Sequence, residues 1–215
     1  MPRAHTLDER ERIRERLLQA GCSGFGRVGL AKITIAELAR EAGIGKGSFY
    51  QFFESKEELF LAVQEQQEAM FKASLARELE RAASGRQAVH RLLTVTATRL
   101  DDHPFLRLLL DPQTIATLTL RIPPERLAAH READREYFIG LLRGWKRRGW
   151  LRHEVDPQVA FDVLTAIFAI SLQRELLGAD VVQRAVEELA TSVAERWCPS
   201  RSGRPGRERG AERRA

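Results

Sequence analysis

Apolar residues recur every three to four positions along most of this chain, which is the spacing of one face of an α-helix. The clearest stripe occupies positions i, i+3, i+4 and i+7 after a threonine: Ile35, Leu38, Ala39 and Ala42. Thr34 followed by Glu37 is a capping box that can satisfy two backbone N–H groups at a helix start. Gly43 follows the stripe, at the position where a helix commonly ends in a left-handed residue. The pattern predicts a short, well-delimited helix.

A second helical pattern follows at once, with Phe49, Phe52 and Phe53 after the sequence Gly43-Ile44-Gly45. Ser55 followed by Glu58 is another capping box and opens a third helix. Two short helices joined by a tight, glycine-containing turn form a helix-turn-helix, whose second helix can enter the major groove of DNA.

The polar side of that second helix carries the candidate chemistry. With the phenylalanines turned inward, five residues are left for solvent or DNA: Lys46, Gly47, Ser48, Tyr50 and Gln51. A cation, small residues, a hydroxyl, a phenol and an amide suit phosphates and base edges. Lys56 lies at the start of the next helix, where backbone N–H groups also favour a phosphate. The alternative is a small helical turn with ordinary polar faces.

The same periodicity predicts helices through the rest of the chain, and the fold class is therefore all-α. An amphipathic helix with alternating charges begins near residue 7. The further predicted helices span about 55–82, 87–101, 105–110, 124–148, 157–177 and 180–197, with a connection over 111–123. Asp156-Pro157 is a typical start, because an aspartate caps the helix and proline suits its first position.

The stretch from Thr34 to Phe60 resembles the DNA-binding region of the tetracycline-repressor (TetR) family of bacterial transcription regulators. The residues that carry the resemblance are Thr34, Ala36, Leu38, Ala39, Ala42, Gly43, Lys46, Gly47, Phe49, Tyr50, Phe53, Lys56, Leu59 and Phe60. The resemblance implies an N-terminal three-helix DNA-binding domain and extends the first helix to about Val28. It implies that Gln51 helps to set sequence preference. It also implies contacts with DNA, chiefly its backbone, by Thr34, Lys46, Gly47, Tyr50 and Lys56. Gly45 departs from the family's usual serine or threonine, which removes a hydroxyl cap and a phosphate contact.

The two terminal helices are strongly apolar and suggest an isologous dimer interface. The candidate interface residues are Phe161, Leu164, Phe168, Leu172, Val182, Val186, Leu189 and Val193. The alternative is that these residues form the core of a monomer. Family members usually dimerise in this way, and a dimer would place two reading helices ~34 Å apart on a palindromic operator.

The resemblance also implies that the larger helical body binds a small, mostly apolar effector that releases the DNA. Candidate pocket residues are Leu92, Thr96, Phe105, Leu109, Tyr137, Phe138, Leu141 and Trp145. At helical spacing, such residues can equally be plain core. Two alternative functions are a ligand-independent DNA-binding or architectural protein, in which the body only dimerises, and an enzyme with a DNA-binding appendage.

Composition supports a DNA-binding head on a less basic body. Residues 1–56 hold ten Lys and Arg against seven Asp and Glu, and residues 199–215 hold six Arg against two Glu. The net charge of the whole chain is +5, so the body between them is slightly acidic. No leader or membrane-length apolar run is evident, and two distant cysteines suit a reducing compartment, so we expect a cytoplasmic protein.

No catalytic or metal-ligating constellation is evident, and we expect no cofactor. Residues 24–29 match the dinucleotide fingerprint G-x-G-x-x-G but lack the preceding strand and following helix that it requires. The predicted organisation is a DNA-binding domain over 1–55, an effector and dimerisation domain over 56–198, and a disordered basic tail over 199–215.

Overall fold

The computed structural model describes residues 6–98, 105, 108 and 111–199, without the side chains of residues 96–98 and 175. Every regular element in these residues is an α-helix, so the all-α prediction is confirmed. The helices are α1 (Leu7–Val28), α2 (Ile35–Glu41), α3 (Lys46–Phe49), α4 (Lys56–Glu80), α5 (Gly85–Thr98), α7 (Pro112–Arg121), α8 (Pro124–Arg147), α9 (Pro157–Ser171), α10 (Arg174–Leu177) and α11 (Ala179–Trp197).

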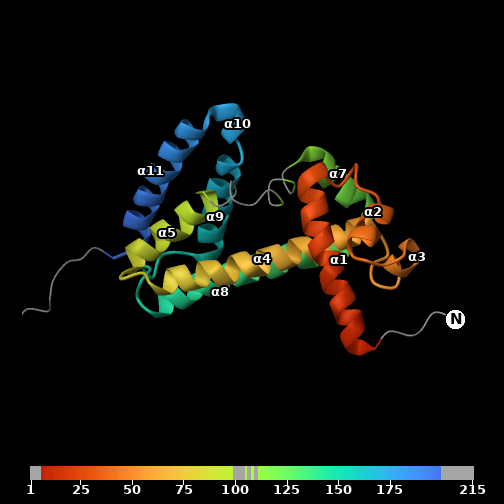
Figure 1. Ribbon diagram of the computed structural model, residues 1–215. Coiled ribbons are helices and arrows are strands. Elements are labelled where there is room, and N and C mark those ends of the chain that lie inside the picture. Colours follow the sequence, from red (N-terminus) through yellow and green to blue (C-terminus); the bar gives the residue numbers. More distant parts are fainter. Residues whose placement is uncertain (1–5, 99–104, 106–107, 109–110, 200–215) are drawn as a thin grey trace, which may run out of the picture.

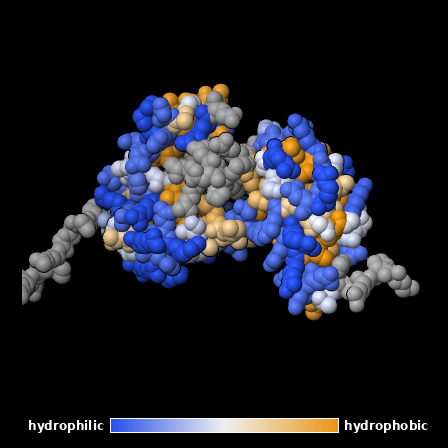
Figure 2. All heavy atoms as spheres, viewed as in Figure 1, coloured by the Kyte–Doolittle hydropathy of each residue, from blue (hydrophilic) through white to orange (hydrophobic). Residues whose placement is uncertain are grey.

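The molecule has two groups of helices connected by the long helices α4 and α8 (Figure 1). Helices α1, α2, α3 and α7 gather at the first end of α4, whereas α5, α9, α10 and α11 gather at the other end. Figure 2 shows hydrophilic residues over much of one face, with apolar patches in both groups. Among the described residues, no helix is both long enough and apolar enough to cross a lipid bilayer.

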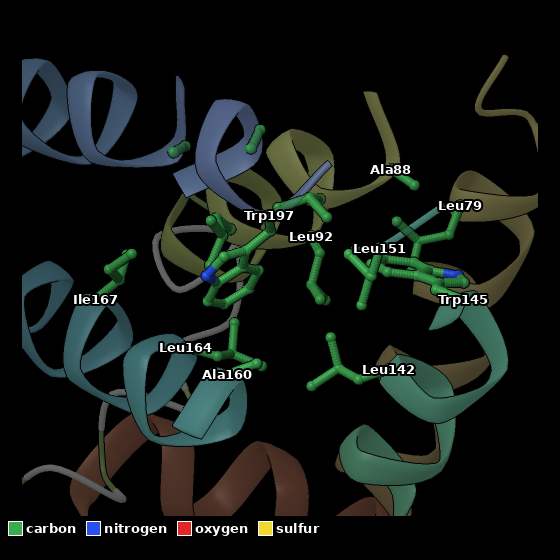
Figure 3. Packing of buried hydrophobic residues seen from close by; sticks show 14 of the residues in the cluster. Leu79, Ala88, Leu92, Leu142, Trp145, Leu151, Ala160, Leu164, Ile167 and Trp197 are labelled. Atoms are coloured by element: carbon green, nitrogen blue, oxygen red, sulfur yellow. The ribbon is translucent and has the colours of Figure 1, made fainter. Parts of the chain in front are cut away.

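The buried apolar residues form two separate clusters. The N-terminal core contains residues of α1–α3 and the first turns of α4, together with Phe105, Leu118 and Ile122 from much later in the chain. The body core joins α4, α5, α8, α9 and α11 around Leu92, Leu142 and other large side chains (Figure 3). The predicted boundary at residue 55 remains a prediction, but the N-terminal core extends beyond it.

Capping signals in the sequence correspond to real helix starts. The Ser55 hydroxyl accepts a hydrogen bond from the Glu58 N–H at 3.1 Å at the start of α4. Asp156 accepts one from the Gln158 N–H at 2.8 Å at the start of α9. These side chains satisfy backbone donors that have no partner inside the helix.

The connection predicted over residues 111–123 is wrong, because these residues contain helix α7. The Asp111 carboxylate accepts hydrogen bonds from both the N–H and the hydroxyl of Thr114, each at 2.8 Å, and Pro112 takes the first helical position. Thr114 and Leu118 are buried, which fixes the inner face of this helix.

The single helix predicted over 157–177 is also wrong, because it divides into α9 and α10. The N–H groups of Leu172 and Gln173 bond three residues back, to Ala169 and Ile170, which tightens the final turn of α9. The buried Ser171 hydroxyl donates to the carbonyl of Ile167 at 2.9 Å, a local bond that often accompanies bending of a helix. The predicted short helix over 105–110 lies mostly outside the described residues.

Candidate nucleic-acid interface

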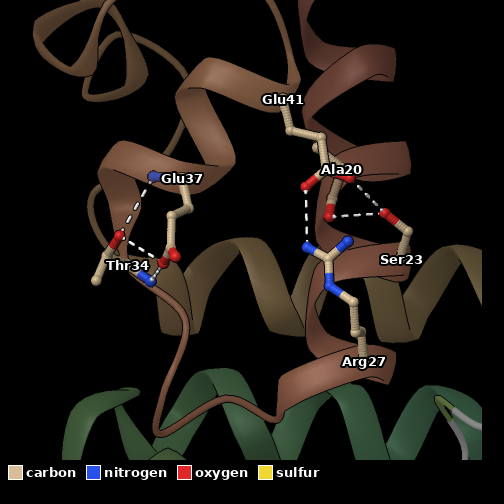
Figure 4. A network of polar contacts seen from close by, with 6 residues as sticks. All are labelled: Ala20, Ser23, Arg27, Thr34, Glu37 and Glu41. Carbon is tan, nitrogen blue, oxygen red and sulfur yellow. Dashed lines mark hydrogen bonds and ion pairs between the residues drawn. The ribbon is translucent and has the colours of Figure 1, made fainter.

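The start of α2 is held by the predicted capping box, which is present in full (Figure 4). The Thr34 hydroxyl oxygen accepts from the Glu37 N–H at 3.2 Å, and the Thr34 N–H donates to the Glu37 carboxylate at 2.8 Å. The Thr34 hydroxyl also donates to that carboxylate, at 2.7 Å. The hydroxyl bond, and then the backbone bond, hold the pKa of Glu37 below its usual value. Thr34 is exposed, so the N-terminus of α2 faces solvent with its geometry fixed.

Helix α2 is also attached to α1. The Ser23 hydroxyl donates to the Glu41 carboxylate at 3.0 Å, and Arg27 lies 3.6 Å from the same carboxylate (Figure 4). Leu38 and Ala39 of α2 are buried in the N-terminal core. Helix α2 is therefore a stable platform for the helix that follows.

Helix α3 presents the predicted polar surface. Phe49 is fully buried and anchors the helix, and the Phe49 and Tyr50 rings meet edge to face with centroids 5.7 Å apart. Tyr50 is 53% exposed, so its phenol reaches solvent. Lys46, Gly47 and Gln51 are exposed beside it, and Ser48 is half-buried. The structure brings these five residues onto one accessible surface, but their contact with DNA remains a prediction.

Two arginines of α1 support the end of this surface. Arg10 donates a hydrogen bond to the Gln51 carbonyl at 3.3 Å, and its guanidinium lies 5.3 Å from the Phe52 ring centroid. The Arg14 guanidinium lies 5.6 Å from the Phe53 ring centroid. The i, i+4 spacing of Arg10 and Arg14 places them on one side of α1.

Glycine is required where α2 turns into α3. Gly43 has φ of 70°, a left-handed conformation that side chains other than glycine rarely adopt. Gly45 is the N-cap of α3 and provides no side-chain hydrogen bond. This agrees with the expected loss of a hydroxyl cap at Gly45.

Lys56 occupies a different environment from the other predicted DNA-binding residues. Its side chain is partly buried at the start of α4, and its ammonium group donates to three backbone carbonyls of the turn between α1 and α2. The structure therefore gives Lys56 intramolecular partners, and its role as a phosphate contact remains a prediction.

The predicted effector-pocket residues do not all come together. Leu92, Phe138 and Trp145 are buried in the body core, with Tyr137 and Leu141 packed against it. The Tyr137 hydroxyl donates to the Lys72 carbonyl at 3.2 Å, and burial raises the pKa of this phenol.

Three other predicted pocket residues cannot be grouped with these five. Phe105 lies in the N-terminal core instead. The side chain of Thr96 and the whole of Leu109 lie outside the described residues. That any of the eight residues line a pocket remains a prediction.

The predicted dimer residues also divide into two groups. Leu164, Val182 and Val186 are buried in the body core, so they contribute to the packing of a single chain. The others are at least partly accessible on α9, at its end or on α11: Phe161, Phe168, Leu172, Leu189 and Val193.

An open groove of about 910 Å³ lies at the far end of the body, bordered by the start of α5, the turn that follows α8 and the end of α11. Its lining includes Arg86, His90, Trp150 and Cys198, but none of the predicted pocket residues. Within the described part of the chain, no group of three or more His, Cys, Asp or Glu side chains could hold a metal ion.

The N-terminal helices are similar in sequence to known regulatory proteins. Residues 17–63 match the family model described as bacterial regulatory proteins, tetR family. A 49-residue segment is 45% identical to the uncharacterised HTH-type transcriptional regulator YerO of Bacillus subtilis. That match spans 23% of this chain and 17% of the length of YerO, so it concerns the DNA-binding region alone.

Solved structures match over much more of the chain. A TetR family transcription regulator from Marinobacter aquaeolei superposes with a TM-score of 0.61 and 16% identity, covering 91% of this chain and all of that one. The transcriptional regulator FadR from Bacillus subtilis, solved with stearoyl-CoA, gives a TM-score of 0.56 and 13% identity, with 83% and 97% covered. At these identities the likeness concerns the fold.

Proposed function

Because this chain belongs to the tetR family of bacterial regulatory proteins, we propose that it is a DNA-binding transcriptional regulator. In this proposal the protein is a repressor that binds a palindromic operator as a homodimer. A small, mostly apolar effector releases it from the operator. The family consists of DNA-binding regulators, so the alternative of an enzyme with a DNA-binding appendage is set aside.

The surface of α3 is the observation that carries the proposal. The buried Phe49 side chain anchors α3 in the N-terminal core, whereas Lys46, Gly47 and Tyr50 are exposed to solvent. An ammonium group and a phenol can bind phosphate oxygens, and glycine lets the backbone come close to them. The Gln51 side chain can pair with an adenine edge through two hydrogen bonds, which would give sequence preference.

The accessible apolar residues of α9 and α11 support the homodimer of this proposal. Leu189 is 37% exposed, Val181 is 46% exposed, and Phe161 and Phe168 are partly accessible. Two copies of this face can pair about a two-fold axis, as most homodimers do. The pair would then present two copies of α3 to successive major grooves, about 34 Å apart.

The effector part of the proposal rests on the helical body. FadR from Bacillus subtilis, which shares the fold, was solved with stearoyl-CoA. The body of this chain is likewise built around large apolar side chains, including Leu92, Phe138 and Trp145. A ligand that prefers a conformation with differently spaced reading helices would weaken DNA binding by that difference in affinity. We place the protein in the cytoplasm, where the bacterial chromosome lies.

The test is selection of duplexes from a random-sequence library by the full chain, followed by gel-shift titration. We expect the wild type to enrich a palindromic site, and we expect Lys46→Ala and Tyr50→Ala to weaken binding to it. Circular dichroism should show that both variants remain folded. Enrichment of no sequence, or equal affinity in both variants and the wild type, would contradict the proposal.

A further inference from the structure

Lys56 donates hydrogen bonds to three carbonyl oxygens at once. Its Nζ lies 2.7 Å from the oxygen of Leu30, 3.3 Å from that of Ala31 and 3.0 Å from that of Ile33. An ammonium group has three N–H donors. These bonds therefore use the full donor capacity of Lys56, and a phosphate contact would have to replace one of them.

The three carbonyls belong to the turn between α1 and α2. Thr34, the N-cap of α2, directly follows Ile33 and carries the capping box with Glu37. Lys56 is the first residue of α4, and the neighbouring Leu59 and Phe60 are fully buried in the N-terminal core. The hydrogen bonds of the Lys56 ammonium group thus attach the turn before α2 to the first residue of α4, which is held in the N-terminal core. Hydrogen bonds from an ionised donor are stronger than neutral ones, so this connection restrains the turn effectively.

We propose that Lys56 is a positioning residue for DNA binding, which acts through the turn between α1 and α2 and makes no phosphate contact itself. The inference rests on the proposed DNA-binding function. Helix α2 packs against α3, so the position of the turn determines where α2, and with it α3, meets the duplex. Removal of the ammonium releases the turn, but it removes none of the exposed side chains of α3.

Lys46 is the matched control for Lys56, because it is exposed on α3 and lies next to the proposed DNA surface. Lys56→Met and Lys46→Met each remove one ammonium and keep an unbranched apolar side chain. Affinity is measured across a salt series for a duplex selected by the wild type, at a temperature where circular dichroism shows every variant folded. We expect Lys56→Met to lower affinity roughly tenfold with an unchanged salt slope. We expect Lys46→Met to reduce that slope by about 0.9, the value for one lost phosphate contact.

Two results in the salt series would overturn the inference. A salt slope reduced by about 0.9 in Lys56→Met would identify Lys56 as a phosphate contact. Unchanged affinity in Lys56→Met, with only a lower melting temperature, would make its role purely structural. Lys56→Arg separates charge from geometry, because a planar guanidinium retains the charge but cannot reproduce the converging bonds of an ammonium. We expect Lys56→Arg to lose affinity as well, and full affinity in this variant would contradict the proposal.

Hydrogen exchange of the free protein tests the same inference without DNA. We expect faster exchange at the first amides of α2 in Lys56→Met than in Lys46→Met, because the turn before α2 is released. If the wild type binds no duplex, the proposed function fails. The restraint of the turn by Lys56 is then tested by hydrogen exchange alone, and unchanged protection of the α2 amides in Lys56→Met would contradict it.

Discussion

The ring of Phe105 lies against that of Phe60, with centroids 4.8 Å apart and planes inclined by 35°. Phe105 is also 6.4 Å from Phe25 between ring centroids and is only 4% exposed. A residue from beyond α5 therefore completes the core of the N-terminal helices. The stability of the proposed DNA-binding region depends on the body of the same chain.

Phe105→Ala should destabilise the N-terminal core by about 3–5 kcal/mol, the usual result of removing a buried phenylalanine ring. Urea denaturation followed by circular dichroism measures this change. Leu120→Ala is the control, because Leu120 lies on α7 with 84% exposure and should have little effect. Equal stability of the two variants would show that Phe105 contributes little to the packing.

Much of the N-terminal region could be predicted from the sequence because its signals are local. Thr34 and Glu37 are three residues apart, so their capping box can be recognised without knowledge of the tertiary structure. The inward position of Phe49 follows from helical spacing alone. Asp111-Pro112 is the same kind of signal as Asp156-Pro157, so α7 could have been predicted from it.

Other features depend on contacts that helical spacing does not reveal. Phe105 is one of the candidate pocket residues, yet it packs into the core of the other group of helices. Val182 and Val186 have the spacing of an interface seam, but α5 and α9 of the same chain already contact their helix. Lys56 occupies a position typical of a phosphate contact, and the distant turn carbonyls that bind it are not evident from its neighbours in sequence.

Gly47→Ala should stabilise the free protein and weaken DNA binding. Alanine is favoured over glycine within a helix by roughly 0.5–1 kcal/mol, and no atom lies within 4 Å of a Cβ added at Gly47. The same methyl group would stand between the α3 backbone and a phosphate if the duplex comes close. Thermal denaturation and gel-shift titration measure the two effects. Gly140→Ala in α8 meets equally open space, so it should stabilise the protein without changing DNA affinity.

The association of two chains can be tested with a charge on the exposed face of α11. If the proposed homodimer pairs through this face, Leu189→Arg should raise the dimer dissociation constant by at least about 30-fold, which corresponds to ~2 kcal/mol. Analytical ultracentrifugation over a range of protein concentrations measures this constant. Leu120→Arg is the control, because Leu120 is exposed on α7, in the other group of helices. The same dissociation constant in both variants would place the interface elsewhere.

His130 of α8 should make stability depend on pH. Its side chain is 13% exposed and lies 3.3 Å from Glu68 of α4. The hydrogen bond with Glu68 raises the pKa of His130 against the opposing effect of burial, and the charges of Glu68, Glu65 and Asp134 add to the rise. Burial would raise the pKa of Glu68, but hydrogen bonds from His130 and Gln64 and nearby positive charges lower it overall.

The signs of these shifts define the expected profile. The contribution of protonated His130 is complete below its unfolded pKa of about 6.5 and is lost as pH rises through its folded pKa. The contribution of Glu68 is lost as pH falls through its own lowered pKa. The melting-temperature difference between wild type and His130→Gln should therefore shrink as pH rises from about 6.5, the unfolded pKa, through the raised folded pKa of His130. His153→Gln serves as the control, since the His153 side chain is 97% exposed. A difference that stays constant over this range would contradict the assignment.

The shared N-terminal core limits how this protein can be recombined with its relatives. A chimera that joins residues 1–55 to a foreign body would place Phe25 against side chains that did not evolve with it. Leu118 of α7 and Ile122, which follows that helix, would be lost from the same core. Exchange of DNA specificity should therefore succeed when only the exposed residues of α3 are replaced. Phe49 and the N-terminal core that surrounds it then keep their own side chains.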